Sequence, residues 1–183
     1  AAVAEVLSTT HLSIGPRLEA FEQAVAGYVG AAHGIGVNSG TSGLHLCVIA
    51  AGVEEGDLVI TTPFSFVASA NCILYERAVP VFVDVDECTG NVDPSLVAEA
   101  AEDLAAGGER ARRWLPPSMR DGGSPGRLRA LLPVHAFGQP ADMDALAEVA
   151  SRHDLSVIED ACEALGAEYK GRRVGALGDA GVF

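Results

Sequence analysis

Basic residues are scarce in this chain of 183 residues, which has 12 Lys and Arg against 25 Asp and Glu and a formal net charge of −13. A surface of that sign repels polyanions, which argues against nucleic acid and anionic membrane as partners. No apolar run has the length of a membrane-spanning helix, and no signal-peptide pattern opens the sequence. We therefore predict a cytoplasmic protein with neither nucleic acid nor membrane as a partner.

Metal-binding and nucleotide-binding motifs are missing as well. The four cysteines show no CxxC pair and no His-rich spacing, so we expect reduced, structural thiols and no metal site. The sequence contains neither GxxxxGK[ST] nor GxGxxG, which removes most of the support for ATP or a dinucleotide as ligand.

Apolar content is high, at 49%, and the chain alternates between strand-like and helix-like segments without a repeat. This pattern predicts an α/β fold with a mainly parallel sheet. We expect helices at about 16–29, 41–51, 65–76, 93–106 and 141–153, strands at 33–38, 58–61, 79–85, 130–134 and 155–160, and a hairpin at 169–174. Residues 107–128, rich in Arg, Gly and Pro around Trp114, read as a long loop or insertion.

A carboxylate ends the most strand-like run of the chain, Val157, Ile158, Glu159 and Asp160. Parallel strands deliver such residues to the edge of the sheet where open α/β folds bind ligands. If Asp160 is buried, its carboxylate needs a cation as a partner. A protonated pyridine nitrogen is such a cation, and an aspartate beside it would keep the ring an electron sink. Capping of the next helix and metal binding are the alternatives. By strand alternation, Glu159 points to the opposite face.

A second ligand signal is the turn Gly40, Thr41 and Ser42, which follows a strand-like run and opens a helix. Free amides at a helix start, together with hydroxyl groups, can bind a phosphate. A plain N-cap made by Ser39 or Thr41 is the alternative. A phosphate site combined with the acid at Asp160 suggests a phosphorylated cofactor with a basic ring nitrogen.

Two further polar or aromatic residues follow predicted strands. Phe66 could stack on a flat ring, although an aromatic residue at such a place is often core. His135 could contact cofactor or substrate, or it could support other site residues.

Seven collinear segments together resemble the StrS-type nucleotide-sugar aminotransferases. The segments are SIGP at 13–16, NSGTSGL at 38–44, SFVASAN at 65–71, PVFVDVD at 80–86, PVHAFGQPADM at 133–143, EDACEALGA at 159–167 and GDAGVF at 178–183. The resemblance covers nearly the whole chain except 107–128. It implies the three-layer large domain of the aspartate-aminotransferase fold and the cofactors pyridoxal 5'-phosphate and pyridoxamine 5'-phosphate.

The resemblance also implies roles for individual residues. Gly40, Thr41 and Ser42 match the phosphate-binding turn, Phe66 the ring that stacks on the pyridine, and Asp160 the partner of its nitrogen. Glu163 stands where the family often has Gln near the phenolic oxygen, a contact that a carboxylate makes only when protonated or bridged by water. Ser13 and Gly15 match a segment near the sugar-nucleotide site.

The family's cofactor-binding lysine is expected beyond Phe183. Lys170, the only lysine here, lies in a Gly-Arg-Arg turn out of register for that role. We therefore expect the cofactor-binding large domain of a longer polypeptide, incomplete at both ends, with the smaller C-terminal domain outside this chain.

The implied activity is transfer of an amino group, from glutamate as the expected donor, to a nucleotide-linked keto-sugar by a homodimer. A dehydratase with His in place of the lysine and a non-catalytic regulator are the alternatives.

Overall fold

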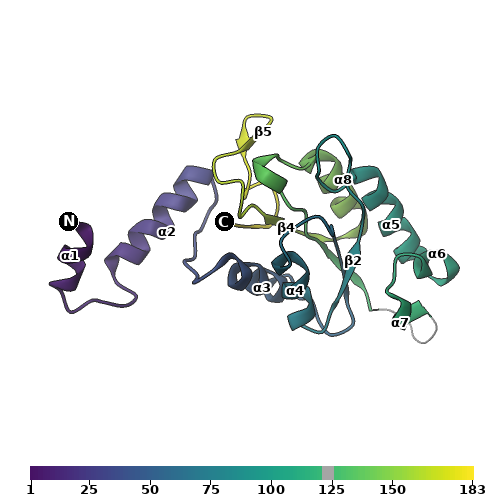
Figure 1. The fold of residues 1–183 in the computed structure, drawn as a ribbon, viewed down its shortest axis with the longest axis horizontal. Coiled ribbons are helices and arrows are strands. Elements are labelled where there is room, and N and C mark those ends of the chain that lie inside the picture. Colours follow the sequence, from purple (N-terminus) through teal and green to yellow (C-terminus); the bar gives the residue numbers. More distant parts are fainter. Residues whose placement is uncertain (121–125) are drawn as a thin grey trace. The chain divides into compact units, whose positions relative to one another are not determined.

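The computed structural model describes residues 1–120 and 126–183, which divide into two compact units, 1–37 and 38–183 (Figure 1). The first unit contains α1 (Ala2–Leu7) and α2 (Pro16–Val29). Helix α2 has its predicted bounds because both end signals are local: Pro16 fixes φ in the first turn, and Gly30 adopts φ 85° to end it.

The strand predicted at 33–38 is wrong, because this segment carries no strand in the structure. It lies against α2 instead, where the Gly36 N–H donates to Glu22 Oε1 at 2.7 Å. A Cβ on Gly34 would come within 2.4 Å of the Glu22 carbonyl oxygen. The glycines therefore serve close approach to a helix rather than pairing with a strand.

A five-stranded sheet forms the centre of the second unit, with strand order β2-β1-β3-β4-β7 and every pairing parallel. The strands are β1 (Leu58–Thr61), β2 (Val79–Phe82), β3 (Leu128–Leu131), β4 (Ser156–Asp160) and β7 (Ala180–Val182). This confirms the predicted α/β fold with a parallel sheet. Strand β2 is shorter than predicted, and β3 begins and ends earlier.

Helices cover both faces of this sheet. Helices α3 (Gly40–Ala50) and α4 (Ala68–Tyr75) share a buried core with Val59, Leu132 and Ile158. Helices α5 (Pro94–Ala106) and α8 (Met143–His153) share the other core with Ile60 and Leu131. Alternate residues of β1 and β3 thus point to opposite faces, as strand geometry requires. None of the helices in residues 1–120 and 126–183 is long and apolar enough to cross a membrane.

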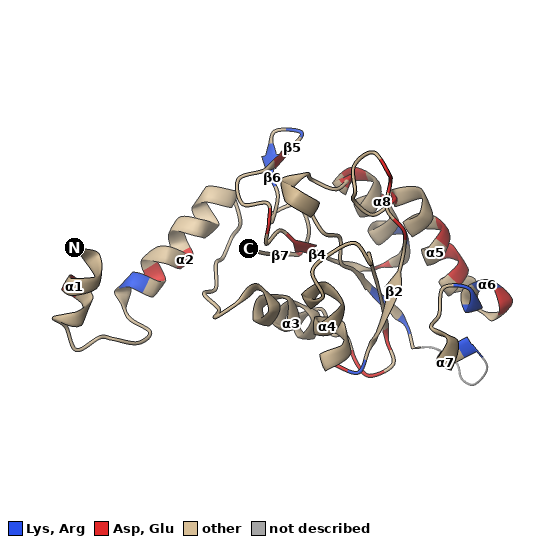
Figure 2. Ribbon diagram, in the orientation of Figure 1, with Lys and Arg blue, Asp and Glu red and all other residues tan. Residues whose placement is uncertain are grey.

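The segment expected as a loop at 107–128 contains two short helices, α6 (Gly108–Arg112) and α7 (Pro117–Arg120), and residues 121–125 lie outside the described part. Asp103 of α5 anchors it by accepting from Trp114 Nε1 at 3.0 Å and from Arg113 Nε at 2.9 Å. Figure 2 shows acidic residues along the ribbon of α5 and basic residues in the neighbouring ribbon of α6. Part of the positive charge of this segment is therefore neutralised within the fold.

Two small elements complete the second unit. The predicted hairpin is confirmed as β5 (Glu168–Tyr169) paired with β6 (Arg172–Arg173). A single 3₁₀ turn, η1 (Ala136–Gly138), follows β3.

Candidate active site

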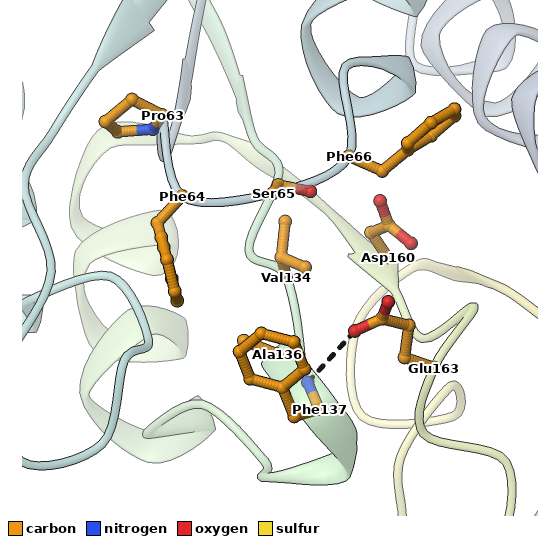
Figure 3. Close-up of a pocket in the computed structure, with 9 residues that line it drawn as sticks. All are labelled: Pro63, Phe64, Ser65, Phe66, Val134, Ala136, Phe137, Asp160 and Glu163. Carbon is orange, nitrogen blue, oxygen red and sulfur yellow. Dashed lines mark hydrogen bonds between the residues drawn. The ribbon is translucent and has the colours of Figure 1, made fainter.

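A pocket of about 250 Å³ opens at the carboxyl edge of the sheet, where open α/β folds bind ligands. Its lining comes from the segments that follow three adjacent parallel strands, β1, β3 and β4. The lining residues are Pro63, Phe64, Ser65, Phe66, Val134, Ala136, Phe137, Asp160 and Glu163. Figure 3 shows Asp160 and Glu163 on one side of this pocket and Phe64 on the other. Three predicted site residues, Phe66, Asp160 and Glu163, are thus brought together.

Asp160 is the buried carboxylate of the pocket, and neighbouring groups hold both of its oxygens. Ser69 Oγ donates to Oδ2 at 2.7 Å, and the Cys162 N–H donates to Oδ1 at 3.3 Å. The second contact lies within a local turn, and no helix follows β4 in residues 161–183, so the alternative that Asp160 caps the next helix is wrong. In the part of the chain that the structure describes, no Lys, Arg or His pairs with this carboxylate. It can therefore accept a cationic donor from a ligand.

The negative charge of Asp160 affects the neighbouring thiols. Burial, followed by the charge of Asp160, raises the pKa of Cys72 to about 12. The same two causes, in the same order, raise the pKa of Cys162 to about 12. Both thiols therefore stay protonated at neutral pH, as expected for structural cysteines, and all four cysteines are free.

The predicted phosphate-binding turn forms the start of α3, directly against the turn that follows Asp160. Ser39 caps this helix by accepting from the Ser42 N–H at 3.2 Å, which is the plain capping role considered above. No described residue accepts from the N–H groups of Gly40 and Thr41, so both are available to an anion. A Cβ on Gly40 would lie 2.6 Å from Cys162 Sγ. Glycine thus allows the helix start to approach the carboxylate turn.

Glu163 faces the pocket and accepts from the Phe137 N–H at 3.1 Å through Oε2 (Figure 3). This bond supports a strained residue, since Phe137 has φ 52° and its side chain is 80% exposed. The Phe137 ring meets Phe64 edge to face, with centroids 5.8 Å apart. One oxygen of Glu163 is thus occupied by the protein and the other can face a ligand.

Phe66 is 76% exposed, so it is not the core residue of the alternative interpretation. His135, in contrast, is fully buried and does not line the pocket. Its Nε2 lies 3.0 Å from Glu159 Oε2, and its Nδ1 accepts from the Ala141 N–H at 3.1 Å. This placement favours a supporting role for His135 over contact with a ligand.

The remaining predicted residues lie elsewhere. Ser13 and Gly15 belong to the unit 1–37, whereas every residue of the pocket belongs to the unit 38–183. Lys170 occupies the β5–β6 turn and pairs with Asp144 of α8. The substrate assignment of Ser13 and Gly15 stays a prediction.

Sequence reasoning missed Ser69 as the partner of Asp160. A signal was present in the serines at 65 and 69, which lie one helical turn apart just after a predicted strand end. Their hydroxyl groups lie 2.7 Å from one another, so Ser65 extends the hydrogen-bond chain that ends at Asp160.

These features fit a phosphorylated pyridine cofactor. Among the described residues, an acid without a cationic partner ends a strand at the pocket, free amides start a helix next to the turn after that acid, and an exposed aromatic ring lines the pocket with the acid. Asp160 could meet the ring nitrogen, Gly40 and Thr41 the phosphate, and Phe66 one face of the ring.

Comparison with known proteins identifies relatives that are aminotransferases. The model of the DegT/DnrJ/EryC1/StrS aminotransferase family matches residues 1–183. GDP-perosamine synthase of Caulobacter vibrioides is 40% identical over 99% of this chain and 43% of its own length. The dTDP-3-amino-3,4,6-trideoxy-alpha-D-glucose transaminase of Streptomyces venezuelae is 40% identical over 100% of this chain and 42% of its own.

A solved structure of Bacillus subtilis NtdA with bound cofactor PMP superposes with a TM-score of 0.74 and 30% identity, over 94% of this chain and 34% of that one. The chain thus spans about two fifths of the length of the curated relatives, 43% and 42%. Since the family model covers every residue and the fold agrees, the chain belongs to the DegT/DnrJ/EryC1/StrS aminotransferase family.

Proposed function

We propose that this chain is the cofactor-binding part of a pyridoxal-phosphate-dependent enzyme that transfers an amino group to a nucleotide-linked keto-sugar. One observation carries the proposal: Asp160, a buried carboxylate without a cationic partner among the described residues, lies two residues from Cys162, whose sulfur contacts the start of α3. An acid for a ring nitrogen and amides for a phosphate thus lie at one edge of the sheet.

Each residue has a distinct task in this proposal. Asp160, held by Ser69 and the Cys162 N–H, would keep a proton on the ring nitrogen of the cofactor. The amides of Gly40 and Thr41 and the hydroxyl of Ser42 bind the phosphate. Phe66 covers one face of the ring and limits the access of water. When bound, the cofactor supplies an electron sink and carries the amino group between donor and acceptor.

The choice of substrate and donor belongs to the same proposal. The names of two relatives, a GDP-perosamine synthase and a dTDP-sugar transaminase, support a nucleotide-linked sugar as acceptor. Glutamate is the donor that we propose. Ser13 and Gly15 are the proposed contacts to the sugar nucleotide, and Glu163 is the proposed contact to the phenolic oxygen of the cofactor. One Glu163 oxygen accepts from the Phe137 N–H, which leaves the other oxygen for this contact. Because an ionised carboxylate has no donor, the contact would need a proton on Glu163 or a bridging water.

The proposed complete enzyme is a cytoplasmic homodimer. Apolar side chains on the outer faces of α3 and α4, among them Leu46, Ile49 and Leu74, are about half exposed in the single chain, at 52%, 47% and 51%. Such a surface is typical of an interface between subunits. Light scattering of the full-length protein should give the mass of two protomers.

The full-length protein tests the activity. Incubated with pyridoxal phosphate, glutamate and a nucleotide-linked keto-sugar, it should release 2-oxoglutarate and an amino-sugar nucleotide in equal amounts. Borohydride reduction of the loaded protein should fix the cofactor to one lysine peptide located beyond Phe183. A His at that position, with loss of water from the sugar instead of amino transfer, would identify a dehydratase. Neither reaction and no cofactor binding would identify a non-catalytic homologue.

A further inference from the structure

Glu159, the neighbour of Asp160, is a second buried acid that the proposed chemistry does not use. Its side chain is 0% exposed and lies on the other face of β4, as strand alternation predicts. Four hydrogen bonds reach it. Oε2 accepts from His135 at 3.0 Å and from the Gly175 N–H at 2.7 Å, and Oε1 accepts from the N–H groups of Leu177 and Gly178, both at 2.7 Å.

The contacts identify the protonation state of the pair. The Ala141 N–H donates to His135 Nδ1, so the proton of a neutral imidazole is on Nε2 and points to Glu159. Burial by itself raises the pKa of Glu159, but the bonds from His135, Gly175, Gly178 and Leu177 together outweigh it and hold the pKa below the usual value. An ionised Glu159 is therefore stabilised by N–H dipoles rather than by a cation.

The segment that Glu159 holds leads directly into strand β7. Next to it, Asp179 Oδ2 accepts from the Val157 N–H at 2.8 Å, which fixes the start of the β4–β7 pairing. A Cβ on Gly181 would lie 2.3 Å from the Gly175 Cα, so segment 175–178 packs directly on β7. In the resulting register Glu159 pairs with Gly181 and Asp160 with Val182.

We propose that Glu159 is a positioning residue: through its four donors it fixes β7 beside β4, and so fixes Val182 beside Asp160 at the edge of the pocket. His135 acts through Glu159 and does not touch a ligand. The catalytic consequence rests on the proposed function, whereas the structural claim about β7 does not.

The test uses the full-length protein with Glu159→Gln, which keeps the shape but loses an acceptor and the charge. Asp57→Asn is the matched control, because Asp57 is also a buried carboxylate and accepts from Arg127 N, Arg129 Nε and Glu54 N, at 3.0, 3.0 and 3.1 Å. Asp57 lies at the opposite edge of the sheet, just before β1. Hydrogen exchange measured by mass spectrometry on peptides covering 175–182 should rise about tenfold in Glu159→Gln and stay unchanged in Asp57→Asn.

Kinetics should separate the same two variants. Misplacement near the reacting groups lowers kcat by about a hundredfold in Glu159→Gln, while the KM for the sugar changes by less than about twofold. Asp57→Asn should lower the melting temperature without lowering kcat at a temperature where it is folded. Equal exchange at 175–182 in both variants would overturn the proposal, whether or not the protein transfers amino groups. Unchanged kcat with raised exchange would overturn the catalytic consequence alone.

Two variants of His135 remain informative if Glu159→Gln does not fold. His135→Gln places an N–H donor near the position of Nε2, whereas His135→Asn keeps only an acceptor near the position of Nδ1. The positioning role predicts slower exchange at 175–182 and higher kcat in His135→Gln than in His135→Asn. The reverse order, or a raised KM for the sugar in both, would contradict it and favour direct contact with substrate.

Discussion

Asp160 can act on a ligand because the protein has already oriented its carboxylate. Ser69 Oγ, at 2.7 Å, holds Oδ2 from the first turn of α4, and the Cys162 N–H holds Oδ1 from the turn after β4. These bonds fix the direction of the carboxylate, which is the arrangement that a protonated ring nitrogen needs. The acid and its supporting hydroxyl come from different elements, so the fold rather than local sequence sets their geometry.

Asp160→Asn should reduce amino transfer by about 10² to 10³-fold in the full-length enzyme, because a neutral amide does not keep the ring nitrogen protonated. Ser69→Ala should have a smaller effect, about threefold to tenfold, because Asp160 keeps its charge but loses one donor. Steady-state kinetics and the absorbance of the bound cofactor measure both. Ser151→Ala is the control, since Ser151 is an exposed residue of α8 and does not line the pocket. A Ser69→Ala enzyme no different from Ser151→Ala would contradict the orienting role.

At the scale of single residues, the sequence indicates which residues belong to the site better than it indicates their hydrogen-bond partners. Asp160 and the Gly40 turn can be recognised because a carboxylate after a buried strand and glycine before a helix are local signals. Ser69 lies 91 positions from Asp160, and His135 lies 24 positions from Glu159. Such pairs form only once the order of the strands is fixed, and the sequence does not encode that order locally.

Between elements, the decisive contact is the approach of the α3 start to the turn after β4. Gly40→Ala should weaken binding of pyridoxamine phosphate by about tenfold, because the new Cβ would lie 2.6 Å from Cys162 Sγ and displace the helix start. Fluorescence titration of the full-length protein measures this.

Adding Cys162→Ala should restore most of that binding, since the Cys162 Cβ would lie 3.8 Å from the new methyl group, an ordinary contact. The single variant Cys162→Ala is the control and should bind nearly as well as the wild type. Additive losses in the double variant would show that the two residues do not meet.

The first and last residues of a helix can be predicted where the residues that begin or end it are adjacent to it in the sequence. Helix α5 begins at Pro94, as predicted, because Asp93 caps it by accepting from the Ser95 N–H at 2.8 Å. The segment 33–38 alternates apolar residues with glycine and polar residues, a pattern that favours a strand. A strand needs a partner, however, and the glycines place this segment against α2 instead. The local sequence pattern does not show which helix or strand such a segment packs against.

For the whole molecule, acid stability depends on carboxylates that the fold keeps ionised. The pKa is held below its usual value at four positions on the α5 and α8 side of the sheet, namely Asp93, Asp103, Asp142 and Glu159. Their donors are hydroxyl, indole, guanidinium, imidazole and backbone N–H groups. Folding therefore favours the deprotonated forms, and the molecule should lose stability as the pH falls.

Glu159 gives the sharpest test of this linkage. A folded-state pKa below the unfolded value, which is near 4.5 for Glu, means that its contribution is complete above that pH and is lost as the pH falls through the lower folded value. The free energy of unfolding should therefore drop less steeply below about pH 4.5 in Glu159→Gln than in the wild type. Urea unfolding of the full-length protein at a series of pH values measures both slopes. Equal slopes in the two proteins would mean that folding leaves the pKa of Glu159 unshifted, and that its four donors do not stabilise the charge on which the positioning of β7 depends.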